Sequence, residues 1–102
     1  MTTINRLQAH LTTPINNLGS IAIKENAQQV VCKDGTSLSV QASEFHYSTP
    51  RENRGPYYQV EVGFPSTDPP STWNSYDCGD GVWGYVPIEL VAKFIDEHGG
   101  PL

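Results

Sequence analysis

An apolar stripe at helical spacing near the C-terminus restricts the fold of this chain more than any other feature. The apolar residues recur at i, i+3, i+4 and i+7, as Ile88, Val91, Ala92 and Ile95. This spacing predicts a helix of about 11 residues with one apolar face. Pro87 fits its first turn, where no backbone N–H is needed, and Gly99-Gly100 ends it. Such a helix must bury its stripe against another element, so the rest of the chain is expected to supply one.

Apolar residues between positions 21 and 42 recur instead with a period of two, which is typical of strands. The three runs are Ile21 and Ile23, Val30 and Cys32, and Leu38, Val40 and Ala42. Asp34-Gly35 separates the second run from the third and predicts a hairpin with a two-residue type I′ turn. A further strand is predicted where Tyr58, Val60, Val62 and Phe64 alternate before Pro65, and a short one at Val82–Val86.

The remaining segments predict a short helix and two loops. Ile4, Leu7 and Leu11 are spaced for a helix over residues 4–11, with Thr3 as its cap. Residues 45–56 and 66–81 have neither period, and a loop of about 16 residues in a compact domain tends to be functional or disordered. We therefore predict a single α+β domain over 1–102. It has a small antiparallel sheet of about four to five strands, the C-terminal helix packed on one face, and a short N-terminal helix.

Composition excludes several classes of protein. The 102 residues are 37% hydrophobic with a net charge of -5, which argues against intrinsic disorder. No apolar run approaches the roughly 18 residues of a membrane span, and the N-terminus lacks the apolar core of a signal peptide. We therefore expect a soluble, cytoplasmic protein without a membrane partner. Cys32 and Cys78 then predict two reduced, partly buried thiols, with Cys32 in the core.

Neither a metal, a cofactor nor an enzyme activity is predicted. Asp77-Cys78-Gly79-Asp80-Gly81 resembles a fragment of a calcium loop, but the ligand set is incomplete, and turn chemistry explains both aspartates. No nucleophile motif accompanies Glu44 and His46, which are expected to be surface groups. His98 suits the C-terminal end of a helix dipole, and Glu89 is spaced to pair with Lys93.

Charge and aromatic residues are unevenly distributed along the chain. Residues 1–54 hold five basic and four acidic side chains, for +1, whereas residues 55–102 hold one basic and seven acidic ones, for -6. This excess of acid argues against direct nucleic-acid binding. All ten aromatic residues lie between positions 45 and 94. We therefore predict a partner-binding face on the 66–81 segment and its neighbours, made of Arg54, Tyr57, Asp68, Trp73, Tyr76, Asp77 and Asp80. The alternative is that Trp73 and Tyr76 fold back as a small core under the loop.

Two segments carry a resemblance. Tyr57–Ser66, with V-E-V-G-F-P-S, and Trp83–Val91, with G-Y-V-P-I-E, resemble short uncharacterised proteins encoded by phages and prophages. Proteins of this size and acidity from such genomes often look like antagonists of host defence, anti-CRISPR proteins among them.

The resemblance implies a small acidic, non-catalytic binding protein encoded by a phage or mobile element. It would inhibit a host complex, for example a CRISPR effector, by surface occupation or nucleic-acid mimicry, so that its partner is a host or phage protein complex. The alternative is a minor phage or prophage structural or assembly protein that acts through self-association, and the oligomeric state, monomer or homodimer, is left open.

Overall fold

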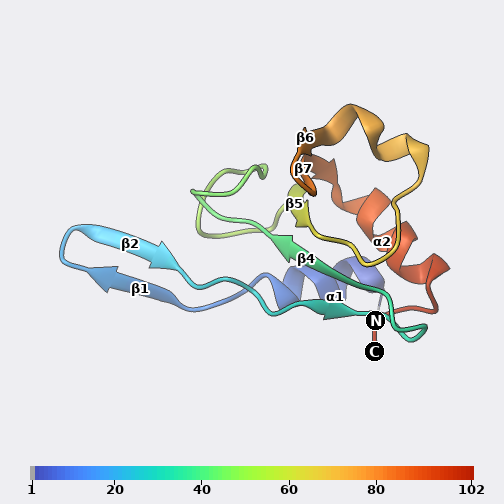
Figure 1. Ribbon diagram of the computed structural model, residues 1–102. Coiled ribbons are helices and arrows are strands. Elements are labelled where there is room, and N and C mark those ends of the chain that lie inside the picture. Colours follow the sequence, from blue (N-terminus) through green and yellow to red (C-terminus); the bar gives the residue numbers. More distant parts are fainter. Residues whose placement is uncertain (1) are drawn as a thin grey trace.

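The computed structural model describes residues 2–102 and has the predicted α+β architecture (Figure 1). Its elements are α1 (Thr3–His10), β1 (Ile15–Leu18), β2 (Ile21–Lys24), β3 (Val30–Val31), β4 (Ser37–Gln41), β5 (Gln59–Gly63), the 3-10 helix η1 (Ser71–Tyr76), β6 (Asp77–Gly79), β7 (Val82–Pro87) and α2 (Ile88–Glu97). An antiparallel five-stranded sheet has the order β3-β4-β5-β7-β6, and β1 and β2 form a separate two-stranded sheet.

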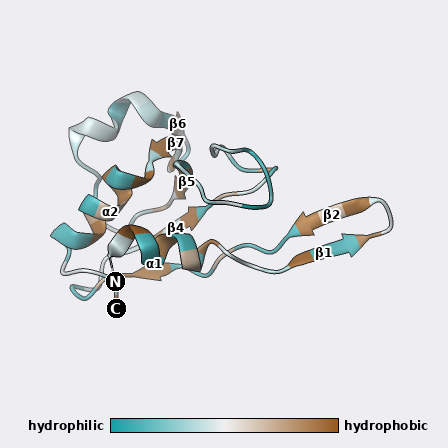
Figure 2. Ribbon diagram, turned by 180° about the vertical axis from the view of Figure 1, so that it is seen from behind, coloured by the Kyte–Doolittle hydropathy of each residue, from teal (hydrophilic) through white to brown (hydrophobic). Residues whose placement is uncertain are grey.

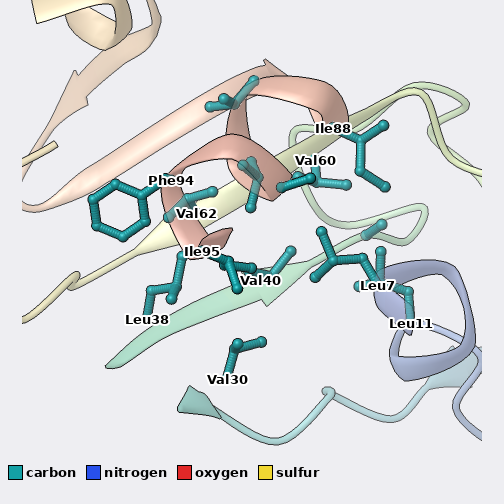
Figure 3. Close-up of a cluster of buried hydrophobic side chains, with 14 of the residues drawn as sticks. Leu7, Leu11, Val30, Leu38, Val40, Val60, Val62, Ile88, Phe94 and Ile95 are labelled. Atoms are coloured by element: carbon teal, nitrogen blue, oxygen red, sulfur yellow. The ribbon is translucent and has the colours of Figure 1, made fainter. Parts of the chain in front are cut away.

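Helix α2 supplies the centre of the core, as its stripe predicts. Ile88, Val91 and Ile95 are at most 2% exposed, and Figure 3 shows α2 side chains facing those of β4 and β5, with Leu7 and Leu11 beside them. Helix α1 packs against α2 and is capped by the side chain of Thr2, not Thr3. The predicted stop at Gly99-Gly100 is also confirmed. Gly99 N–H donates to Asp96 O and Gly100 N–H to Ile95 O, the two bonds of a Schellman motif.

Strands β4 and β5 bury the predicted alternate residues, and the ends of one predicted strand are wrong. Val60 and Val62 are fully buried, but Tyr58 and Phe64 lie outside β5 and are 63% and 68% exposed. Phe64 has a φ of 51°, which turns the chain away from the sheet just before Pro65. The alternation therefore identifies only the middle of this strand.

The β3–β4 hairpin is confirmed, but its turn is not type I′. Cys32 N–H donates to Thr36 O and Gly35 N–H to Cys32 O, so three residues form the loop. Of these three, only Gly35 has a positive φ, at 93°, whereas type I′ requires two. Instead, the Asp34 carboxylate accepts the Thr36 N–H at 2.8 Å. This bond stabilises a three-residue turn in which Gly35 alone adopts a left-handed conformation.

The 66–81 segment is more ordered than a loop. It contains η1 and β6, and β6 pairs with β7 at the edge of the sheet. Two other expectations about side chains are corrected by the structure. Cys32 is buried as predicted, but Cys78 is exposed. The ion pair on α2 joins Lys93 to Glu97 at 4.0 Å and not to Glu89.

The β1–β2 hairpin projects from the body of the molecule, which measures 42 × 30 × 19 Å (Figures 1 and 2). We call residues 14–25 the arm. The period-two run at Ile21 and Ile23 predicts a strand with a buried face, and the strand is present, but both side chains are exposed. The five-stranded sheet and the helices pack with each other and leave this hairpin without a covering layer.

Candidate interaction surface

The arm places three large apolar side chains on one face. Leu18 lies opposite Ile21, and Asn16 lies opposite Ile23. Directly opposed residues in an antiparallel pair point to the same side, and neighbours along a strand point to opposite sides. Leu18, Ile21 and Ile23 therefore share one face, which we call the apolar arm face. Their side chains are 63%, 55% and 39% exposed.

The other face of the arm and its base contact the body. Lys24 is 6% exposed, with its Nζ 5.8 Å from the centre of the Tyr57 ring, and burial lowers the pKa of this lysine. At the base, Glu25 N–H donates to Pro14 O at 2.9 Å, and Asn16 Nδ2 donates to Glu25 Oε1 at 3.0 Å. The Lys24–Tyr57 contact joins the base of the arm to the body, and the two hydrogen bonds close the arm on itself. The tip extends beyond the body (Figure 1).

Between its base residues, the arm lacks the charged side chains and prolines that commonly protect strand edges from other chains. Within residues 2–102, β1 and β2 pair only with each other, so each has one open edge. Residues 15–23 contain no charged side chain and no proline, although exposed edges are commonly guarded by both. The cores of protein–protein interfaces are likewise depleted of charge. An uncharged hairpin with an exposed apolar face therefore has the composition of an interface.

Three of the residues predicted to bind a partner, Asp68, Asp77 and Asp80, are exposed on the 66–81 segment. Tyr76 is partly buried and packs against the core, as the alternative for this residue expects. Asp77 Oδ1 accepts the Gly79 N–H at 2.8 Å, the turn chemistry predicted for this aspartate. We call the three exposed aspartates of this segment, Asp68, Asp77 and Asp80, the acidic surface.

Two other predicted contacts, Trp73 and Tyr57, are buried. Trp73 is 1% exposed and packs against Phe94 and Trp83, with ring centres 5.3 and 6.3 Å away. The alternative prediction, that Trp73 folds back under the loop, is therefore confirmed. Tyr57 is 2% exposed, and its hydroxyl donates to Glu52 O at 2.8 Å. Neither side chain is available to a partner in this conformation.

Arg54 is exposed but lies apart from the acidic surface. The turn after β6 is held beside the C-terminal end of β5, where Phe64 N–H donates to Gly81 O at 2.8 Å. Arg54 and Tyr57 precede the other end of β5, where Gln59 pairs with Pro87. The seven predicted residues therefore do not form one continuous surface.

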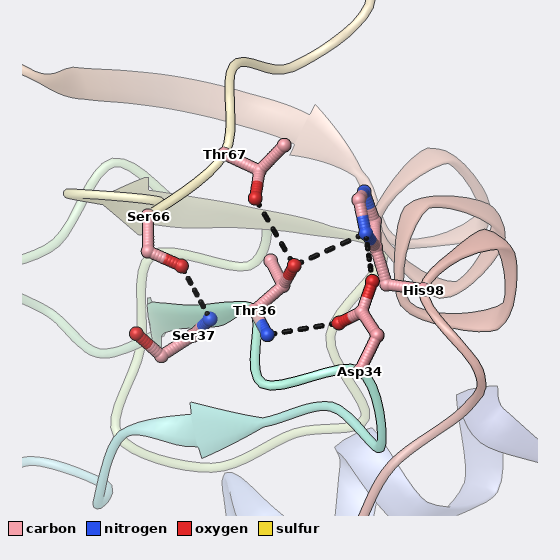
Figure 4. Close-up of polar contacts among 6 residues, drawn as sticks. All are labelled: Asp34, Thr36, Ser37, Ser66, Thr67 and His98. Carbon is pink, nitrogen blue, oxygen red and sulfur yellow. Dashed lines mark hydrogen bonds and ion pairs between the residues drawn. The ribbon is translucent and has the colours of Figure 1, made fainter.

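A cluster around His98 has catalytic residue types but a structural arrangement (Figure 4). His98 Nδ1 lies 2.6 Å from Asp34 Oδ2 and 3.1 Å from Thr36 Oγ1, and Thr36 Oγ1 lies 3.1 Å from Thr67 Oγ1. In a catalytic triad of hydroxyl, imidazole and carboxylate, the two nitrogens of the imidazole ring bind different partners. Here Asp34 and Thr36 share one nitrogen, so the imidazole cannot take a proton from Thr36 while it donates to Asp34.

The cluster instead joins three segments of the fold. It ties the β3–β4 turn to the end of α2 and to the chain after β5. The Thr36 N–H, followed by the His98 side chain, lowers the pKa of Asp34 below its ordinary value. His98 was expected to interact only with the helix dipole, and the structure gives it a carboxylate partner as well.

The second histidine–hydroxyl contact has no accessible nucleophile. Ser43 Oγ lies 2.6 Å from His46 Nδ1 and also accepts the Phe45 N–H at 3.0 Å. Ser43 is 2% exposed, and burial lowers the pKa of His46. Glu44 contacts Asn53 on its own loop. The arrangement stabilises the turn that follows β4.

Comparisons with known proteins add no family. No protein-family model matches the chain, and neither the curated proteins nor the solved structures contain a significant match. Within residues 2–102, no group of three or more histidine, cysteine, aspartate or glutamate side chains is arranged to hold a metal ion. Over the same residues, none of the helices has the length and apolar character needed to cross a membrane.

Sequence reasoning missed the arm because Ile21 and Ile23 have the spacing of core residues. One signal was available. Gly19-Ser20 lies between two four-residue runs, as two-residue hairpin turns require, and Gly19 has a φ of 65°. This signal predicts the hairpin itself, but its exposure depends on which other elements cover it and is not encoded in the turn.

Proposed function

We propose that this chain is a small non-catalytic binding protein that occupies the surface of a partner protein with its arm. The observation that carries this proposal is the apolar arm face, where Leu18, Ile21 and Ile23 project on an uncharged hairpin beyond the body. A two-stranded hairpin is marginally stable in water by itself. Exposing three large aliphatic side chains on such a unit is unfavourable unless a partner covers them.

The acidic surface provides a second element of the proposal. Asp68, Asp77 and Asp80 are exposed in the half of the chain that carries a charge of -6. Surface charge of this kind steers association more than it adds affinity. Within this proposal the arm supplies the buried contact, and the aspartates favour a basic partner. A nucleic-acid-handling complex of the host, such as a CRISPR effector, is a partner of that kind.

The test compares the proteins that are captured by tagged variants from a lysate of the native host. In the arm variant, Leu18→Thr, Ile21→Thr and Ile23→Thr remove the apolar face and keep residues that suit strands. We expect the parent protein to retain a defined set of partners and the arm variant to lose them. Capture of the same partners by a folded arm variant would refute the proposal.

A matched control removes exposed apolar surface elsewhere. Tyr58 and Phe64 are as exposed as Leu18 and lie outside the arm, so Tyr58→Thr with Phe64→Asn removes comparable surface. Asparagine is chosen at position 64 because it tolerates the positive φ found there. This control should capture the same partners as the parent.

Adding purified protein to the captured complex then tests whether binding inhibits the activity of that complex.

A further inference from the structure

We propose that a second copy of this chain pairs with the open edge of β2, antiparallel and centred on Ala22, so that two arms form one four-stranded sheet. This inference rests on the proposed function and deepens it, since the second copy would extend the apolar arm face that the partner covers. Its support is the hydrogen-bonding pattern of the arm, the position of its apolar side chains and the distribution of charge.

The outward hydrogen-bonding groups of β2 follow from the pairing at the base of the arm. Glu25 N–H donates to Pro14 O, which makes this a hydrogen-bonded pair. Such pairs alternate with non-hydrogen-bonded ones along an antiparallel ladder. Asn17 and Ala22, which lie opposite each other, are therefore a non-hydrogen-bonded pair. The backbone N–H and C=O of Ala22 point outward, to the open edge of β2.

The position of the side chains selects the register. Ile21 and Ile23 share one face of β2, and Ala22 and Lys24 share the other. In a two-fold pairing with Ala22 opposite Ala22 of the second copy, Ile21 lies opposite Ile23 of the second copy. Every apolar side chain then stays on the same face. A shift by one residue would place Ile21 opposite Ala22 and bring opposite faces together.

This pairing doubles the apolar arm face. Leu18, Ile21 and Ile23 from each copy form one continuous face of six aliphatic side chains across the four-stranded sheet. At the two-fold axis, each Ala22 N–H donates to the C=O of Ala22 of the second copy. The pairing covers the open β2 edge of each copy, so the unpaired backbone groups of these edges no longer attract other chains.

The shape and charge of the molecule permit this contact. The chain carries -5 overall, so two bodies repel each other. The arm is uncharged from Ile15 to Ile23 and extends away from β6, which carries Asp77, and from β7 (Figure 1). Pairing through β2 therefore joins two copies at neutral surfaces and keeps their acidic ends apart. Because only a few residues pair, the buried area is below that of a standard interface, and a weak dimer is expected.

Sedimentation equilibrium of the purified protein tests the inference. The protein concentration is raised to about 1 mM, so that a dimer with a dissociation constant near that value is detected. The parent protein should form a dimer and no larger species. Ala22→Pro removes the outward N–H without removing a bond to β1, since proline is tolerated at such edge positions. We expect this variant to dimerise about ten- to a hundredfold more weakly, because each dimer loses both hydrogen bonds at the axis.

Asn17→Pro is the matched control, because Asn17 lies directly opposite Ala22 and its N–H points to the open edge of β1. It should dimerise like the parent. A parent protein that stays monomeric at 1 mM, or two proline variants that weaken the dimer equally or not at all, would overturn the inference. Thermal melts establish that both variants are folded. Failure here leaves the proposed function standing if the arm variant still loses its partners.

Discussion

Replacing Trp73 with alanine separates a core role from a contact role for this side chain. The indole is 1% exposed, with Phe94 and Trp83 against it. Truncating a buried tryptophan costs about 3–5 kcal/mol, of which the two aromatic contacts account for about 1–3 kcal/mol. A domain of this size has a free energy of unfolding of about 5–15 kcal/mol. With an m-value of roughly 1.5–2 kcal/mol/M, the midpoint of urea unfolding should fall by about 1.5–3 M.

Two further variants make that measurement decisive. Trp73→Phe keeps an aromatic ring beside Phe94 and should lose less stability than Trp73→Ala. Tyr58→Ala removes a side chain that is 63% exposed and should change stability by less than about 0.5 kcal/mol. A Trp73→Ala protein that unfolds within about 1 kcal/mol of the parent would refute the reasoning. Loss of partner binding in that stable variant would restore Trp73 as a contact.

Three other predictions concern the core, acid sensitivity and cofactors. Ile95→Ala should cost about 2–5 kcal/mol in the same unfolding assay, since Ile95 is fully buried; a loss below 1 kcal/mol would show that the stripe is not core. Asp34 has a folded pKa below its ordinary 3.8, so its contribution to stability is present above that pH and is lost as the pH falls through the folded pKa. Asp34→Asn should therefore flatten the acid side of the stability profile, and an unchanged acid dependence would count against the His98 cluster. Excess reductant should leave the melting temperature unchanged because Cys32 and Cys78 are unpaired thiols, and excess chelator should do the same because residues 2–102 hold no cluster of metal-ligating side chains; a drop of more than a few degrees with either would contradict this.

The parts of the fold that were predictable from sequence are those determined by local patterns. The apolar stripe and the two glycines specify what α2 buries and where it ends, and both predictions hold. Pro87 was predicted in the first turn but is the N-cap, one residue before the helix, with an extended ψ of 132°. The alternation at Val60 and Val62 likewise predicts the buried face of β5. These features depend on the period of a single segment, so neighbouring segments change them little.

The candidate site was not predictable because it depends on what covers each segment. Ile23 and Val40 have the same period-two spacing, yet Ile23 is 39% exposed and Val40 is fully buried. The difference is tertiary, since α2 covers β4, whereas no element within residues 2–102 covers the face of β2 that carries Ile23. Trp73 shows the reverse case. It lies in a segment without periodicity, and its burial arises from Phe94 and Trp83, which are 21 and 10 positions away in the chain.

A photo-crosslinking amino acid placed at Ile21 tests most directly whether the arm is the interaction surface. Irradiation in the native host should join this variant covalently to a partner protein, and an additional adduct at twice the chain mass would come from a second copy. The same group at Tyr58, which is 63% exposed outside the arm, should give no such adduct. Adducts at position 58 with none at position 21 would contradict the account.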